Sequence, residues 1–135
     1  LTFDDPSEHV ILPEVISKEP ISPMVAHGED HWRDIAFWVF NALIAAEEHG
    51  ITQANVDQMR SSSNNPEIQR ILGVTGKFAA KLKLSDSWAY DAIKGVGNYG
   101  EIWDRHLGPN TKIGADRGLN NLWTNGGLMM SPPFR

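Results

Sequence analysis

The residue pattern with the best-defined chemistry is Gly95-Val96-Gly97-Asn98-Tyr99-Gly100, which satisfies the G-x-G-x-x-G string of dinucleotide-binding proteins. In those proteins the glycines follow a strand and open a helix, so that a pyrophosphate can approach the backbone. Here a helical run precedes them, which makes the cofactor interpretation weak. Because a glycine inside a helix costs about 1 kcal/mol relative to alanine, we expect the three glycines to mark close packing against another element or a local break.

A second chemical pattern is the pair His27 and His31, with Gly28-Glu29-Asp30 between them. It resembles the H-x-x-E-H zinc motif, but Asp30 stands where that motif has the longer glutamate. A helix is expected to begin inside the pattern, so the two imidazole rings should not share one face. We expect a solvated helix start here, and a metal-dependent hydrolase that uses the two histidines is a minor alternative.

The remaining candidates also predict no catalysis. Glu47-Glu48-His49 offers acids and a base, but neighbours on a helix point roughly 100° apart, so we expect a solvated helix end. The chain has no cysteine, and Ser61 to Ser63 fall in a polar loop, which leaves no nucleophile paired with a base. We therefore predict a protein that is not an enzyme and has no catalytic residue, metal site or cofactor.

Helices are expected to position most of these residues. From Asp30 to Gly50 apolar residues recur every three or four positions, which predicts a helix capped by Asp30 and ended by Gly50. Its apolar residues surround much of its circumference, so it should be buried on more than one side. Further helices are predicted over residues 52–60, 67–72, 77–82, 88–107 and 119–123. Core positions are expected for four tryptophans in the helical patterns, Trp32, Trp38, Trp88 and Trp103.

Two short segments have strand character. Residues 9–16 are rich in branched apolar side chains, although Pro13 restricts them to an edge strand or an extended connector. Met24-Val25-Ala26 is a second candidate, just before Gly28. Strands this short need partners, which the chain does not obviously contain. The predicted fold class is mainly α with two or three short β strands, in one compact unit.

Composition and charge exclude several classes of protein. The chain has 135 residues, of which 41% are hydrophobic and 21% charged, as in an ordinary globular domain. No apolar run is long enough to span a membrane. The net charge of -5 disfavours nucleic acid as a partner, and the acidity lies in residues 1–30, which hold seven acids and one base. The opening Leu1 to Pro6 has no signal-peptide character, so we expect a chain that is processed or cut from a longer one.

Several longer stretches are more specific than these short motifs, because they occur together and in order. They are residues 10–20 (VILPEVISKEP), 97–102 (GNYGEI), 117–123 (RGLNNLW), the pair Gly126-Gly127 and residues 131–135 (SPPFR). The combination resembles the carboxy-terminal part of the periplasmic binding proteins of general L-amino-acid ABC importers, which are family 3 extracellular solute-binding proteins. The sequence departs from that pattern at Ile21-Ser22-Pro23-Met24, where relatives tend to read Leu-Gly-Pro-Val, and at Met129-Met130-Ser131.

The resemblance implies a partial lobe of a type II periplasmic-binding-protein-like α/β fold, from a protein whose two lobes hold an amino acid between them. Residues 1–17 would end the second lobe, residues 18–28 would cross the hinge, and residues 29–135 would form the helical part of the first lobe. The hinge residues would be Lys18, Glu19, Pro20, Ile21 and Ser22. The ligand-contacting Arg and Asp of the family match no position here, so the ligand-binding residues are expected upstream of Leu1.

For function, the resemblance implies a non-catalytic fragment of the substrate-binding component of an amino-acid ABC importer. Its partners would be an L-amino acid in the full-length parent and the membrane permease, and its location the periplasm, although the chain carries no signal peptide. The fragment alone should bind no amino acid. A stand-alone helical interaction module derived from such a receptor is the alternative. Unpartnered strands and an apolar helix also predict that the fragment covers its exposed surface as a homo-oligomer.

Overall fold

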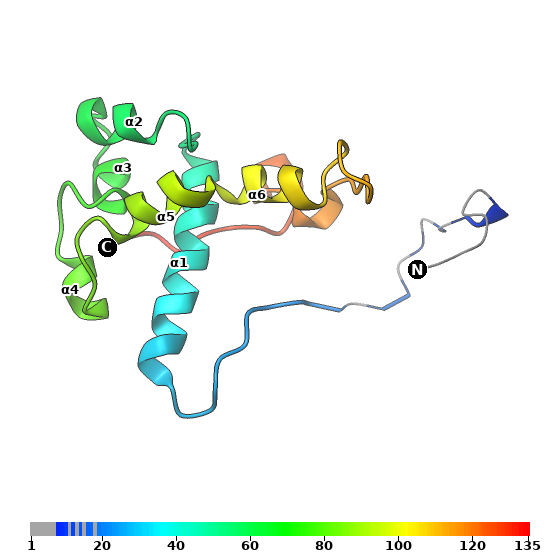
Figure 1. Ribbon diagram of the computed structural model, residues 1–135, viewed down its shortest axis with the longest axis horizontal. Coiled ribbons are helices and arrows are strands. Elements are labelled where there is room, and N and C mark those ends of the chain that lie inside the picture. Colours follow the sequence, from blue (N-terminus) through cyan, green and yellow to red (C-terminus); the bar gives the residue numbers. More distant parts are fainter. Residues whose placement is uncertain (1–7, 11, 13, 15, 18) are drawn as a thin grey trace.

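The computed structural model describes residues 8–10, 12, 14, 16–17 and 19–135 of the chain. Its helices are α1 (Asp30–Glu48), α2 (Val56–Ser62), α3 (Pro66–Ile71), α4 (Phe78–Leu82), α5 (Trp88–Val96) and α6 (Tyr99–His106), followed by the 3₁₀ turns η2 (Gly118–Asn120) and η3 (Trp123–Asn125). Figure 1 shows a largely helical body, which confirms the predicted mainly α class. Within the described residues, none of the helices has the length and apolar character needed to cross a membrane.

The short strands expected near the amino terminus are not seen in the described residues. Residues 24–26 belong to no strand, and neither do the described positions within 9–16, whereas Ile11, Pro13 and Val15 lie outside the described residues. The amino-terminal segment, which we define as residues 19–28, runs apart from most of the helical body before it turns into α1 (Figure 1). Strands of this length need neighbouring strands, and the described part of the chain supplies only the isolated bridge between Leu122 and Met129.

α1 is the axis of the fold, and α5 and α6 cross it toward its carboxy-terminal end (Figure 1). The predicted helix is confirmed, with Asp30 as its first residue rather than its cap, and Gly50 follows its end with a φ of 64°. Residues 41–46 are buried, whereas Trp32 and Phe37 are 57% and 50% exposed. The prediction of burial on more than one side is therefore wrong for the first half of α1, where the described residues leave one side largely open.

The core lies where the other helices meet the second half of α1. Small side chains of α1, namely Ala42, Ala45 and Ala46, share one buried cluster with Ala89 and Ile93 of α5. Because these side chains are short or slender, the two helices can approach closely and leave little empty space between them. The packing of α5 on α1 thus follows from the alanine positions of α1.

The tryptophans expected in the core divide into two groups. Trp38 and Trp88 pack against it, and Trp103 is partly buried, with an indole N–H that has no hydrogen-bond partner. Trp32 is more than half exposed, so its predicted core position is wrong. It lies on the first half of α1, where the described residues provide too few neighbours to bury so large a side chain.

The single helix predicted over residues 88–107 is wrong, because α5 and α6 are separated by a break. Gly97 occupies the break with a φ of 81°, a conformation that few other residues adopt. Asn98 then caps α6: its Oδ1 accepts from the Glu101 backbone N–H at 2.9 Å, and its own backbone N–H donates to Glu101 Oε2 at 2.8 Å. Asn98 Nδ2 also donates to the Ile51 carbonyl at 2.8 Å, which fixes the break beside the end of α1.

The shorter helices lie within a few residues of their predicted positions. Pro66 occupies the first position of α3, where its missing N–H costs nothing. Gly73 follows α3 with a φ of 68°, and a Cβ at this position would lie 1.7 Å from the Asp86 carbonyl oxygen. The helix predicted over residues 119–123 is instead replaced by the two turns η2 and η3, so that part of the prediction is wrong.

Candidate functional surface

The G-x-G-x-x-G string shapes the meeting point of α1 and α6. A Cβ added to Gly95 would meet nothing, whereas one added to Gly100 would lie 2.9 Å from the Glu47 carboxylate. Gly97 provides the break between α5 and α6. The prediction of close packing or a break is therefore confirmed at two of the three glycines, and the string has a structural explanation.

Glu47 and Arg117 form a bidentate ion pair at this meeting point. Arg117 Nη1 and Nη2 donate to the two carboxylate oxygens of Glu47, and each side chain is 14% exposed. Arg117 Nη2 also donates to the Asn120 carbonyl at 2.9 Å, and the guanidinium lies 5.3 Å from the centroid of the Tyr99 ring. Burial raises the pKa of the Tyr99 hydroxyl; the charge of Arg117 opposes this rise and that of Glu47 adds to it.

Glu48, the last residue of α1, binds two further residues near the carboxy terminus. Its Oε1 accepts from Trp123 Nε1 at 3.0 Å and from the Ser131 backbone N–H at 3.3 Å. Because adjacent helical residues diverge by about 100°, Glu47 and Glu48 bind residues 117–135, the C-terminal arm, at separate places. The prediction of a solvated helix end is wrong here, because the arm lies over it. No local pattern could have shown this, since the paired residues are 70 to 83 positions apart.

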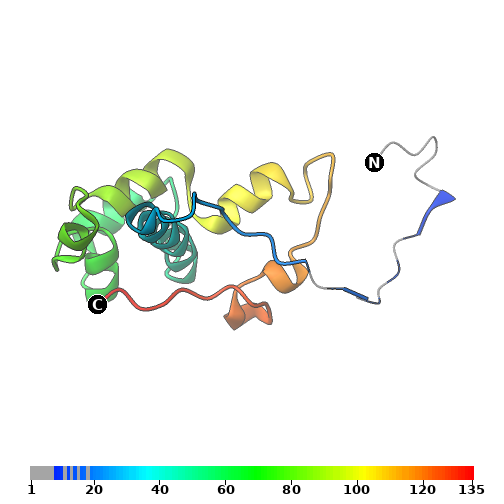
Figure 2. The same ribbon diagram turned by 90° about the horizontal axis from the view of Figure 1, so that it is seen from below.

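The C-terminal arm runs past α1 and ends near α3 and α4 (Figure 2). Phe134 is 2% exposed, and its ring centroid lies 5.2 to 6.3 Å from those of Trp38, Phe78 and Trp88. Arg70 Nε donates to the Phe134 carbonyl at 2.8 Å. The arm therefore completes the aromatic part of the core, and aromatic rings from α1, α4 and α5 pack against its Phe134 ring.

The histidines of the candidate metal motif do not converge. His31 Nε2 lies 2.9 Å from the Leu82 carbonyl oxygen, so this ring connects α1 with the end of α4. His27 is exposed and precedes the helix. Among the residues described by the structure, no group of three or more potential metal ligands comes together. His31 thus has a structural contact, and the geometry gives no support to the hydrolase alternative.

A polar cluster joins α2 and α5, through residues that the sequence analysis did not single out. Lys94 Nζ donates to Asp57 Oδ1 and to the Tyr90 hydroxyl, each at 2.9 Å, and Tyr90 donates to Asp57 Oδ1 at 2.6 Å. The Arg60 guanidinium lies 4.4 Å from the Tyr90 ring centroid. Hydrogen bonds from Tyr90 and then Lys94 lower the pKa of Asp57, and bonds with Tyr90 and Asp57 raise the pKa of Lys94. These groups satisfy one another, so the cluster is a surface link between two helices.

An apolar groove of about 360 Å³ runs along the open side of α1. Its walls come from α1, from the amino-terminal segment and from residues 128–130 of the C-terminal arm. The apolar residues that α1 contributes are Ala36, Phe37, Phe40 and Ile44. Among the described lining residues the charged side chain is Arg33, which lies 3.4 Å from both Asp30 and Asp34. The groove is thus apolar and without a free charge.

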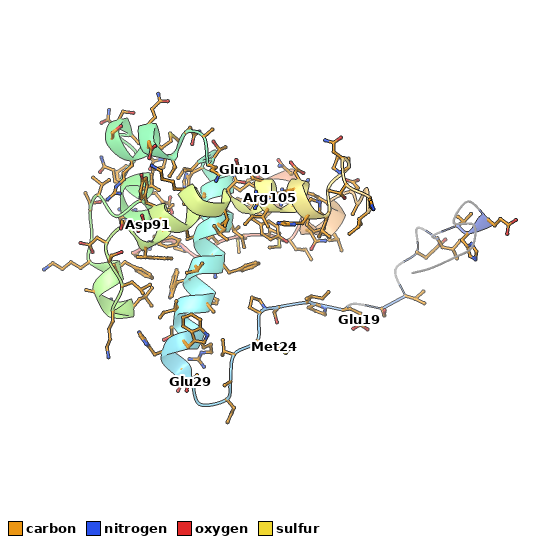
Figure 3. All side chains as sticks on the ribbon, viewed as in Figure 1. Glu19, Met24, Glu29, Asp91, Glu101 and Arg105 are labelled. Atoms are coloured by element: carbon orange, nitrogen blue, oxygen red, sulfur yellow. The ribbon has the colours of Figure 1, made fainter. Side chains whose placement is uncertain are left out.

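Two of the predicted hinge residues line this groove. Ile21 and Ser22 form part of its wall, Glu19 and Pro20 are exposed, and Lys18 lies outside the described residues. Figure 3 shows Glu19 and Met24 on the amino-terminal segment, apart from the side chains of α5 and α6. A hinge role for these residues stays a prediction.

Relatives of the chain are known, although no family model matches it. It is 53% identical over 137 residues to the general L-amino acid-binding periplasmic protein AapJ of Rhizobium johnstonii, and 51% identical over 134 residues to the glutamate/glutamine/aspartate/asparagine-binding protein BztA of Rhodobacter capsulatus. Its identity to the putative amino-acid ABC transporter-binding protein YhdW of Escherichia coli is 44% over 135 residues. These alignments cover 99 to 100% of this chain and 40% of each relative.

A solved structure is also similar. An ABC transporter periplasmic binding protein from Brucella ovis with glutathione bound matches at a TM-score of 0.90 and 48% identity, over 96% of this chain and 41% of that one. The chain therefore spans about two fifths of the length of its relatives, which are binding proteins, in agreement with the prediction of a non-enzymatic protein. Along its whole length, the chain is homologous to a part of the periplasmic amino-acid-binding proteins of ABC transporters.

Proposed function

We propose that the chain is part of the substrate-binding component of an amino-acid ABC importer, a periplasmic protein that binds its ligand without catalysis. The observation that carries this proposal is the identity of 44 to 53% with three amino-acid-binding proteins over the whole chain. The TM-score of 0.90 with a solved periplasmic binding protein supports it. The partners of the whole receptor would be an L-amino acid and the membrane permease.

Within that receptor, the chain would supply scaffold rather than the main ligand contacts. A free amino acid carries a carboxylate and an ammonium group, so its site needs a cation and an anion that converge. In the groove along α1, Arg33 is the charged residue among the described lining side chains, and Asp30 and Asp34 already lie beside it. This pairing favours ligand contacts that come from outside the chain.

The proposal also includes the division of the chain between lobes. Residues 1–17 would end the second lobe, residues 18–28 would cross the hinge, and residues 29–135 would form the helical part of the first lobe. The support for this division is the contrast between the helical body, which begins at α1, and the segment before it. Residues 19–25 of that segment form no backbone hydrogen bond with the residues that the structure describes.

A chimaeric receptor tests the function. The segment of BztA that aligns with this chain is replaced by residues 1–135, and glutamate binding is measured by calorimetry. We expect a dissociation constant within about tenfold of that of BztA, because the ligand contacts come from the retained part. A chimaera that folds, with a single thermal transition, but binds no glutamate overturns the proposal. The isolated chain is the control and should give no heat with a mixture of L-amino acids.

A stand-alone helical interaction module is the second candidate, and exposed apolar side chains favour it. Phe37, Leu128 and Met130, which line the groove, are each at least half exposed. Exposed apolar patches of this kind mark interaction surfaces. The free chain would then cover them as a homo-oligomer, and sedimentation should show dimers at micromolar concentration. A compact monomer under these conditions contradicts that expectation.

A further inference from the structure

Two segments of this acidic chain concentrate positive charge. Residues 68–85, which run from α3 to just before α5, hold four bases and no acid, and residues 117–135 of the C-terminal arm hold two bases and no acid. The chain as a whole has a net charge of -5. Because the arm ends near α3 and α4 (Figure 2), the two segments create a local positive potential on one side of the body.

The two segments meet at a cavity of about 150 Å³. Arg70 of α3 lines it, together with Lys77, which directly precedes α4, and Lys81 within α4. Among the described lining residues none is acidic. Arg135 lines the cavity as well, but it adds a main-chain carboxylate along with its guanidinium, so we assign it no net charge. The cavity is therefore bordered by three net positive charges.

Arg70 is the cation that the fold holds in place. Its Nε donates to the Phe134 carbonyl at 2.8 Å, which fixes the guanidinium beside the C-terminal arm. The side chain is partly buried, and within the described residues neither of its Nη groups has a hydrogen-bond or ion-pair partner. Asp86 borders a neighbouring hollow with Arg70 but forms no ion pair with it in the described part of the chain. A partly buried guanidinium without a counter-charge favours an anion beside it.

Bases elsewhere in the helical body are different, because carboxylates of the chain already neutralise them. Arg33, Lys94 and Arg117 each form an ion pair with an acidic side chain. Lys77 and Lys81 are exposed and form none with the residues that the structure describes. The charge around the cavity is therefore available to an external group.

The size and charge of the cavity indicate which group it fits. Its volume is below the roughly 300 Å³ of a pocket for a drug-sized ligand, so it suits one anionic group rather than a whole larger molecule. A phosphate monoester carries nearly two negative charges at about pH 7 and presents three acceptor oxygens. A carboxylate carries one charge on two oxygens. Three cations around one cavity match the phosphate group better.

We propose that Arg70, Lys77 and Lys81 form a binding site for a phosphate group. Arg70 is the fixed donor, and the two lysines add charge from the side of α4. Phe78 and Phe134 also line the cavity, and their rings lower the local polarity, which strengthens the charge interactions. The phosphate group comes from a small phosphate compound or from a phospholipid head group. The site is separate from amino-acid binding, so it stands or falls independently of the proposed function.

Calorimetric titration of the chain with sodium phosphate, at about pH 7 and constant ionic strength, tests the site. We expect a dissociation constant below about 1 mM, raised at least about fivefold by Lys81→Gln and at least about tenfold by Arg70→Gln. Lys112→Gln is the matched control, because Lys112 is an exposed lysine outside the cavity lining, and it should change the constant by less than about twofold. Lys81 is exposed, so Lys81→Gln keeps the fold and the test stands even if Arg70→Gln unfolds the chain.

Sedimentation with vesicles distinguishes the two sources of the phosphate group. Binding to phosphatidylglycerol but not phosphatidylcholine vesicles, without binding of inorganic phosphate, identifies a lipid head group and supports the site if Lys81→Gln abolishes it. Binding of neither inorganic phosphate nor phosphatidylglycerol vesicles overturns the proposal. An affinity for acetate equal to that for phosphate overturns the assignment to a phosphate group. A phosphate affinity that Lys81→Gln and Lys112→Gln weaken equally shows attraction to charge anywhere on the chain and also overturns the proposal.

Discussion

The two halves of α1 are both rich in apolar residues, yet their surroundings differ. In the second half, residues 41–46 are buried, and Glu47 and Glu48 bind the C-terminal arm. In the first half, one side contacts α4 through His31, while Trp32 and Phe37 stay at least half exposed on the helix surface. One helix therefore has a completed end, residues 41–48, whose side chains have partners within the chain, and an open end, residues 30–40, where large apolar side chains remain exposed.

This difference shows that an apolar helix face indicates a partner without indicating where in the sequence the partner lies. The second half presents Ala42, Ala45 and Ala46, which suit closely crossing helices, and the chain contains such helices. The first half presents large aromatic side chains, which suit a broader apolar surface. Under the proposed function, that surface belongs to the part of the receptor outside this chain.

Phe134→Ala should cause the largest loss at the completed end, about 3 to 5 kcal/mol in the free energy of unfolding. The substitution removes a ring buried among Trp38, Phe78 and Trp88 and releases the end of the C-terminal arm. Urea unfolding followed by tryptophan fluorescence measures it. Met130→Ala, an exposed position on the same arm, is the control and should cost less than about 0.5 kcal/mol. Equal losses would show that the ring does not anchor the arm.

Glu47→Gln should cost about 2 kcal/mol, because it keeps the size of the side chain but leaves the Arg117 guanidinium without a carboxylate in a largely buried position. The urea midpoint at constant m-value measures the change. Glu67→Gln is the control, since Glu67 lies 3.6 Å from His49 and is more exposed, and it should cost less than about 1 kcal/mol. A loss at Glu47 no larger than the loss at Glu67 contradicts the role of the pair.

Alkaline pH should weaken the completed end through Tyr99. Burial raises the pKa of its hydroxyl above the usual value of about 10, so folding favours the neutral form. The stability that this form contributes is complete below the unfolded-state pKa and is lost as pH rises through the folded-state pKa. The free energy of unfolding should therefore fall more steeply as the pH rises above about 10 in the natural protein than in Tyr99→Phe. Urea unfolding at each pH measures the free energy. If its dependence on pH were the same in both proteins, the prediction would be contradicted.

Features determined by single residues could be predicted from the sequence. The helix end predicted at Gly50 was correct, because glycine readily adopts the positive φ that follows a helix; Pro66 at the start of α3 and Gly73 after its end obey the same single-residue rules. The break at Gly97 was harder to predict from the sequence, because the apolar stripe of the helical pattern continues across it. The apolar period predicts a continuous helix there, but the capping box of Asn98 and Glu101 starts a new helix instead.

Contacts between distant residues could not be predicted. Glu47 and Arg117 are 70 positions apart, so each resembles a solvated charge when read locally. The predicted short strands were not seen because strands depend on neighbours, which the described residues lack. The resemblance of longer stretches placed Ile21 and Ser22 in a hinge, but only the structure shows them beside residues 128–130, since no local spacing joins these segments.

Trp32→Gln should have the smallest effect, a change of less than about 0.5 kcal/mol in the isolated chain, even though tryptophan is the largest side chain. Trp32 is 57% exposed on the open half of α1, and glutamine is at least as good a helix former. Trp38→Gln, less than two turns along, is the matched comparison and should cost about 3 kcal/mol, because Trp38 packs edge-on against Phe78 and Phe134. Urea unfolding of both variants measures how much of α1 has a partner in the free chain. Equal losses would mean that the first half is already covered, which would remove the contrast between the two ends and the need for an outside occupant.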